Sequence, residues 1–72
     1  MFVVGTLVKF VWWSNYRAPS VVEDHTGHVT WHEVKPGDTG IVLCEAETDF
    51  VVVLFSNIDS ILKIHHSMLA PI

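Results

Sequence analysis

The stretch FVVVLF, residues 50–55, is apolar at every position. In an extended strand successive side chains point to opposite faces, so a strand formed by this stretch has two apolar faces. A chain of 72 residues builds only one small hydrophobic core, which covers one face of such a strand. The fold must therefore cover the second face with other parts of the chain or with a second chain.

Short alternating runs separated by turn residues make up most of the remaining sequence. Four more runs have the apolar spacing and the residue types of strands: residues 6–12, 28–34, 39–46 and 61–66. Pro36 and Gly37, between two of these runs, are typical of the second and third positions of a type II turn. Because no segment has a sustained apolar stripe of helical spacing, we expect an all-β fold.

A long loop is predicted over residues 14–27, because Ser and Asn begin this segment and Pro19 interrupts regular backbone pairing. Val21 and Val22 are expected to form a short paired segment within it. The order of one strand, a long loop and then closely spaced strands matches a small five-stranded SH3-like barrel. We expect residues 1–72 to form a single domain of this kind.

Four segments of the chain resemble small SH3-like barrel proteins of tailed bacteriophages. These segments are GTLVK at residues 5–9, GDTGIVL at 37–43, VLFS at 53–56 and the tail SMLAPI at 67–72. The resemblance implies a phage-encoded protein located in the host cytoplasm, and it supplies no catalytic residue. Sm-like RNA-binding barrels share the same kind of glycine turns and valine strands, so this second family stays open.

Three of the five histidines lie close together, at His25, His28 and His32. On a helix they would nearly share one face and could hold zinc. Here they pass through the turn at Gly27 into an expected strand, and that geometry is lost. We therefore expect exposed polar histidines and no cofactor, with metal binding by these three as the less favoured alternative.

Aromatic residues form the second cluster of interest. Trp12 and Trp31 each continue an apolar face and are expected to pack in the core. In peptide-binding barrels, aromatic and acidic residues beside the long loop form a groove for a protein partner. The residues that would line such a groove here are Trp13, Tyr16, Glu23 and Asp24.

Catalysis has little support in the sequence. There is no nucleophile motif, no phosphate-binding glycine loop and no pair of carboxylates at a suitable spacing. Cys44 is the only cysteine, which excludes an intrachain disulfide, and we expect it to be a buried, reduced thiol. We expect no catalytic residue and no enzymatic activity.

The charge balance argues against a general affinity for nucleic acid. The formal net charge is −4, and the four basic residues, Lys9, Arg17, Lys35 and Lys63, are scattered along the chain. The N-terminal segment MFVVGTLVKFVWW lacks the basic start and the cleavage site of a signal peptide, and it is too short to span a bilayer. We expect a cytoplasmic protein without a membrane segment.

The surplus apolar face of residues 50–55 predicts self-association, because burying each such side chain is worth about 1.5–3 kcal/mol. Depending on register, the outward set is Val51, Val53 and Phe55, or else Phe50, Val52 and Leu54. We assign the oligomer interface to the first set; the alternative is that the long loop and residues 1–4 cover this face. The expected function is a non-enzymatic, self-associating structural or protein-interaction module, with an Sm-like nucleic-acid-binding ring as the alternative.

Overall fold

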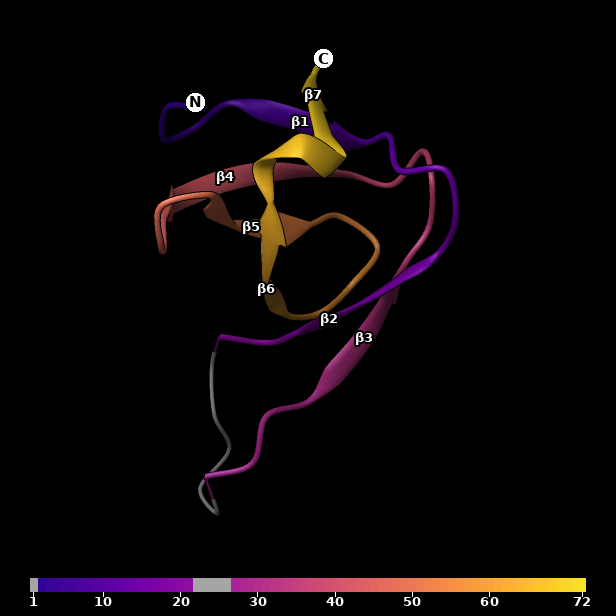
Figure 1. Ribbon diagram of the computed structural model, residues 1–72, viewed down its shortest axis with the longest axis vertical. Helices are drawn as coiled ribbons and strands as arrows, with labels where there is room; N and C mark the ends of the chain where they lie inside the picture. Colours follow the sequence, from indigo (N-terminus) through magenta and orange to yellow (C-terminus); the bar gives the residue numbers. More distant parts are fainter. Residues whose placement is uncertain (1, 22–26) are drawn as a thin grey trace.

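Seven strands and one short 3₁₀ helix are present in the computed structural model, which describes residues 2–21 and 27–72 (Figure 1). The strands are β1 (Leu7–Phe10), β2 (Tyr16–Pro19), β3 (Trp31–Val34), β4 (Thr39–Glu45), β5 (Phe50–Phe55), β6 (Ile61–His65) and β7 (Leu69–Pro71). The 3₁₀ helix, η1 (His66–Met68), lies between the last two strands. Within the described ranges there is no α-helix, and the all-β prediction is confirmed.

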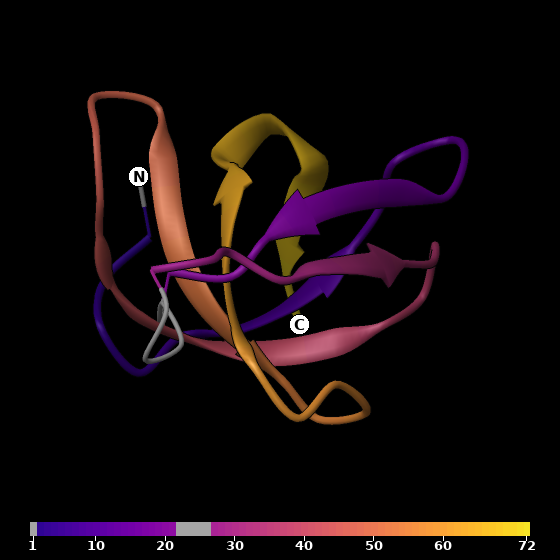
Figure 2. The ribbon, with the colours of Figure 1, turned by 90° about the horizontal axis from the view of Figure 1, so that it is seen from below.

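Five of the strands form one antiparallel sheet in the order β6-β5-β4-β1-β7, and β2 and β3 form a separate hairpin. Figure 2 shows this hairpin lying across the five-stranded sheet rather than within it. The hairpin is joined to the edge strand β6 by a bridge between Ser20 and Leu62 and by a hydrogen bond of 2.9 Å from Val21 N–H to the Ile61 carbonyl. The sheet and the hairpin thereby enclose the core between them.

The core is lined by the inward side chains of the sheet and closed by the hairpin and the tail. On β1 the alternation buries Val8 and Phe10, as their spacing predicts. The hairpin contributes Ala18 and Val34, and the segment after β6 contributes Met68 and Leu69. The remaining fully buried side chains are Val42, Val51, Val53, Phe55, Leu62 and Ile64.

The predicted long loop at residues 14–27 is wrong in part, because β2 lies inside it and pairs with β3. Proline is tolerated at the end of β2 because the next pair, Ser20 and Thr30, makes the ladder hydrogen bond of 2.8 Å. Pro19 lies opposite Trp31 at a position where no N–H is needed. Val21 is hydrogen-bonded as expected, whereas Val22 lies outside the described residues.

A bulge in β4 overturns the prediction that Cys44 is buried. Val42 pairs with Val53 on β5, but Cys44 pairs with Val52, so one extra residue is inserted between the two pairs. Such a bulge reverses the alternation of the faces beyond it. Val42 is therefore in the core, and Cys44 is exposed.

Candidate interaction surface

The side chains of β5 that were assigned to an oligomer interface face the core of their own chain. Val51, Val53 and Phe55 are all buried there, so the assignment of the interface to these three residues is wrong. The reason is register, because β5 pairs with β4 and β6 in a way that turns the odd-numbered residues inward. The outward set is the alternate one, with Phe50, Val52 and Leu54.

The chain itself covers most of this outward set. The Lys63 ammonium lies 5.2 Å from the centre of the Phe50 ring, and His65 meets the same ring edge-on at a centroid distance of 5.2 Å. Val52, which pairs with Lys63, is also buried. Leu54, in contrast, is 40% exposed.

Leu54 belongs to a line of aliphatic side chains that crosses the whole outer face of the sheet. Backbone pairing aligns Leu7 with Ile41, Ile41 with Leu54, and Leu54 with Ile61. Beside β1, Ile72 N–H donates to the Leu7 carbonyl at 3.0 Å, which adds Ile72 to the line. We call this line the outer apolar row; in order across the sheet it is Ile72, Leu7, Ile41, Leu54 and Ile61.

Every residue of the outer apolar row is at least partly exposed, and all of them except Ile61 line a hollow of about 660 Å³. Leu7 is 57% exposed and Ile72 is 73% exposed. The turn between β5 and β6 forms a polar wall of the hollow through Ser56, Asn57 and Asp59. Scattered exposed apolar residues are normal on a protein surface, whereas a continuous apolar patch with a polar rim is typical of an interaction site.

Lys9 lies on the same face as the outer apolar row, two residues beyond Leu7 on β1. It pairs with Thr39, whose hydroxyl is 3.2 Å from the Ser56 hydroxyl at the start of the β5–β6 turn. Lys9 and the acidic Asp59 are therefore on the same side of the row, toward opposite ends of it. The row thus has a basic residue near one end and an acidic residue near the other.

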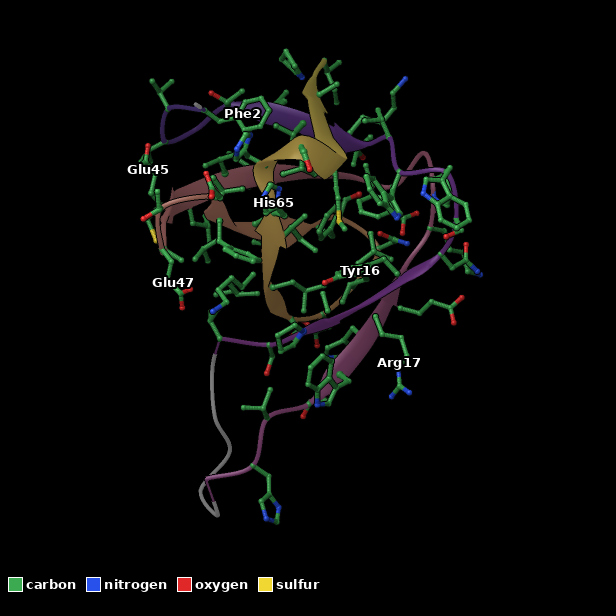
Figure 3. The ribbon with its side chains drawn as sticks, viewed as in Figure 1. Phe2, Tyr16, Arg17, Glu45, Glu47 and His65 are labelled. Atoms are coloured by element: carbon green, nitrogen blue, oxygen red, sulfur yellow. The ribbon has the colours of Figure 1, made fainter. Side chains whose placement is uncertain are left out.

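The predicted groove of Trp13, Tyr16, Glu23 and Asp24 is not assembled by the residues that the structure describes. Trp13 is 81% exposed and has Trp12 as its ring neighbour at 6.2 Å, while Tyr16 packs against the core. In Figure 3, Tyr16 points toward the body of the molecule and Arg17 points away from it. Glu23 and Asp24 lie outside the described residues.

The two other tryptophans differ in their burial. Trp12 is half-buried against the core, as predicted. Trp31 was also expected in the core, but it is 55% exposed on the outer side of β3. The reason is that Val34 faces inward, and Trp31 is three residues away on the opposite face of the strand.

The histidines singled out from the sequence do not converge in the described part of the chain. His28 is exposed, His32 is half-buried on β3, and His25 lies outside the described residues. A different group of ligating side chains comes together instead, where β5 begins and β6 ends: Asp49, His65 and His66.

The basic residues are distributed over different elements. Lys9 is on β1, Arg17 on β2, Lys35 in the turn after β3, and Lys63 on β6. Lys63 is paired with the Glu47 carboxylate at 2.8 Å, which compensates its charge. Within one chain the described residues therefore offer no basic cluster for a phosphate backbone.

Comparison with known proteins adds no relative. Neither the protein-family models, nor the curated proteins, nor the solved structures gave a match to this chain. Among the residues that the structure describes, no helix has the length and hydrophobicity needed to cross a bilayer.

Proposed function

We propose that this chain is an SH3-like barrel that acts as a non-enzymatic structural module by forming a homodimer through the outer apolar row. The observation that carries the proposal is the row itself, a continuous aliphatic line left open on a chain that covers the rest of its β5 side chains. The partner is a second copy of the chain.

Strand order supports the barrel. The SH3-like barrel expected from the sequence has a long loop after its first strand and closely spaced strands after it. The β2–β3 hairpin lies between β1 and β4, and η1 precedes β7. The bridge between Ser20 and Leu62 links the hairpin to β6 and so continues the sheet toward closure.

The composition of the row favours a second copy over an unrelated partner. In order across the sheet its residues are Ile, Leu, Ile, Leu and Ile, so the row is symmetric about Ile41 on the central strand. A two-fold axis parallel to the strands over Ile41 brings Leu7 onto the partner's Leu54. Sheets that pack face to face align their strands within about 30°, which suits this arrangement.

The charges beside the row are complementary under the same two-fold operation. The axis exchanges the β1 side of the sheet with the β5 side and keeps the position along the strands. Lys9 of one chain therefore lies near the partner's Asp59, and this contact is made twice in the dimer. Opposite charges at the rim set the register of an interface more than they add to its affinity.

A stable dimer must bury more surface than the five side chains of the outer apolar row provide. A typical stable interface buries about 800 Å² per partner. This is about a fifth of the 4483 Å² accessible surface of the chain. The polar rim at Thr39, Ser56 and Asp59 has to take part together with the row, which agrees with an apolar centre and a polar border.

Solution mass by light scattering tests the proposal. Wild-type protein is expected at twice the chain mass of 8.1 kDa. Leu54→Asp places a charge inside the interface, opposite the partner's Leu7, and should give a folded monomer. Val29→Asp is the matched control, because Val29 is 39% exposed and lies outside the row, and it should stay dimeric.

A wild-type monomer at high concentration would refute self-association. A large ring-sized mass, together with RNA binding that weakens steeply as salt rises, would replace the dimer by the Sm-like alternative. Loss of the dimer in Val29→Asp as well as in Leu54→Asp would show that the row is not the interface.

A further inference from the structure

Three side chains with metal-binding groups meet where β5 begins and β6 ends. Asp49 directly precedes β5, His65 is the last residue of β6, and His66 begins η1. One ligand atom from each lies within 4.8 Å of the others. Within this group, the His66 Nε2 and Asp49 Oδ1 atoms are 3.6 Å apart.

Backbone pairing between β5 and β6 fixes these three residues next to one another. Phe50 pairs with His65 in the register of the β5–β6 ladder. One step further along, His66 N–H donates to the Asp49 carbonyl at 3.0 Å. Figure 3 shows His65 at the end of β6, beside η1. Backbone pairing thus holds Asp49 on one strand beside His65 and His66 on the other. The three side chains are close together without a loop having to fold over them.

Ring contacts hold the two imidazoles in the same place. The His65 and His66 rings stack with centroids 4.9 Å apart and an interplanar angle of 21°. The Phe50 ring meets His65 edge-on at an angle of 82°. Consecutive residues of a regular strand would point to opposite faces, so this stacking depends on the change from β6 to η1 at this point.

We propose that Asp49, His65 and His66 form a binding site for one zinc ion. Imidazole nitrogens and a carboxylate oxygen are ligands that Zn²⁺ accepts, at about 2.0–2.2 Å each. In a tetrahedral site the ligand atoms are then about 3.3 Å apart, close to the 3.6 Å between His66 Nε2 and Asp49 Oδ1. Three protein ligands leave the fourth position for water or another ligand.

Ser67 supplies the hydrogen bond that such a site requires behind one ligand. In the structure His65 Nδ1 lies 2.8 Å from the Ser67 hydroxyl and accepts from Ser67 N–H at 3.2 Å. Zinc at His65 Nε2 requires the proton on Nδ1, where it is donated to the Ser67 hydroxyl, and the hydrogen bond from Ser67 N–H to Nδ1 is then broken. Metal-bound histidines commonly make a hydrogen bond of this type. Binding therefore moves the His65 proton from Nε2 to Nδ1, which gives a spectroscopic signature.

The test is zinc titration of the full chain without a purification tag, followed by calorimetry and by ¹⁵N NMR of the histidine rings. We expect one zinc per chain, shifts of the His65 and His66 ring nitrogens, and the Nδ1–H form of His65. Asp49→Asn and His66→Gln should each weaken zinc affinity about tenfold or more. His28→Gln and His32→Gln are controls and should leave the affinity unchanged.

Two outcomes would overturn the zinc site. One is the absence of binding and of ring shifts in wild-type protein at millimolar zinc, a measurement that needs no variant to fold. The other is binding that survives Asp49→Asn and His66→Gln but is lost in His28→Gln. The titration is repeated in Leu54→Asp, where the stoichiometry should persist, because the site lies within one chain and does not depend on the proposed dimer.

Discussion

The two faces of the five-stranded sheet are built from the same kinds of residue but have different surroundings. The inner face, with Val51, Val53 and Phe55, is closed by the hairpin and the tail of the same chain. The outer face, which includes Leu54, is left open along the outer apolar row. A small chain covers one face of its sheet with its own elements, and the other face is available to a partner.

Truncating Phe55, on the inner face, should have the largest effect on stability. Phe55 is 1% exposed, so Phe55→Ala leaves a cavity and should cost about 3–5 kcal/mol of unfolding free energy. Leu54→Ala, one residue away on the outer face, should cost clearly less when measured at dilutions where the chain is monomeric. Urea denaturation of both variants is the measurement. Equal losses would contradict the difference between the faces.

A side chain at position 40 should force β4 and β5 apart and so destabilise the sheet. A Cβ on Gly40 would lie 2.7 Å from the Leu54 carbonyl oxygen and 2.8 Å from Val53 Cγ1. Because one of these neighbours is backbone, β4 and β5 must move apart, and Gly40→Ala should cost about 1–3 kcal/mol. Thermal unfolding measures this, with Thr39→Ala as the control. An unchanged melting temperature would show that the strands are more loosely packed than described.

Reversing a charge beside the row tests the symmetry of the dimer. Lys9→Glu removes both copies of the contact in the dimer and should weaken association by up to about thirtyfold, since exposed charge pairs are worth about 0.2–1 kcal/mol each. Adding Asp59→Lys to the same chain should restore the affinity, because the proposed axis places these two positions together across the interface. Sedimentation equilibrium measures both constants. A double variant that associates no better than Lys9→Glu would rule out this axis.

Removing the ion pair between Lys63 and Glu47, beside Phe50 on the outer face, should have the smallest effect on the free energy of unfolding. Glu47→Gln removes the partner of Lys63, and because Glu47 is largely exposed the loss should be no more than about 0.5 kcal/mol. The difference from wild type should fall further at high salt. Urea denaturation at two salt concentrations checks this. A loss above about 1 kcal/mol would show that Lys63 needs this pair to cover Phe50.

The strands themselves were largely predictable from the sequence, because alternation and turn residues are local signals. The runs around β1, β4, β5 and β6 were found in this way. The strand β2 was missed because its partner lies more than ten residues away and its own residues look like a loop. Cys44 was misplaced because a bulge leaves no mark in the alternation of hydrophobic residues.

The interaction surface was harder to predict, for a related reason. The apolar run of residues 50–55 indicates that a second face exists, but only the pairing register decides which side chains lie on it. The outer apolar row takes one residue from each of five distant segments, so no stretch of sequence contains it. The zinc ligands were missed similarly, because Asp49 joins His65 and His66 only through the β5–β6 pairing.

The most direct test of the dimer is an isotope-filtered nuclear Overhauser experiment on a mixture of ¹³C-labelled and unlabelled chains. In the proposed dimer, contacts form between the methyl groups of different chains, from Ile41 to Ile41, from Leu7 to Leu54 and from Ile72 to Ile61. Interchain contacts confined to the β2–β3 hairpin, or no interchain contacts at concentrations where light scattering reports association, would contradict it.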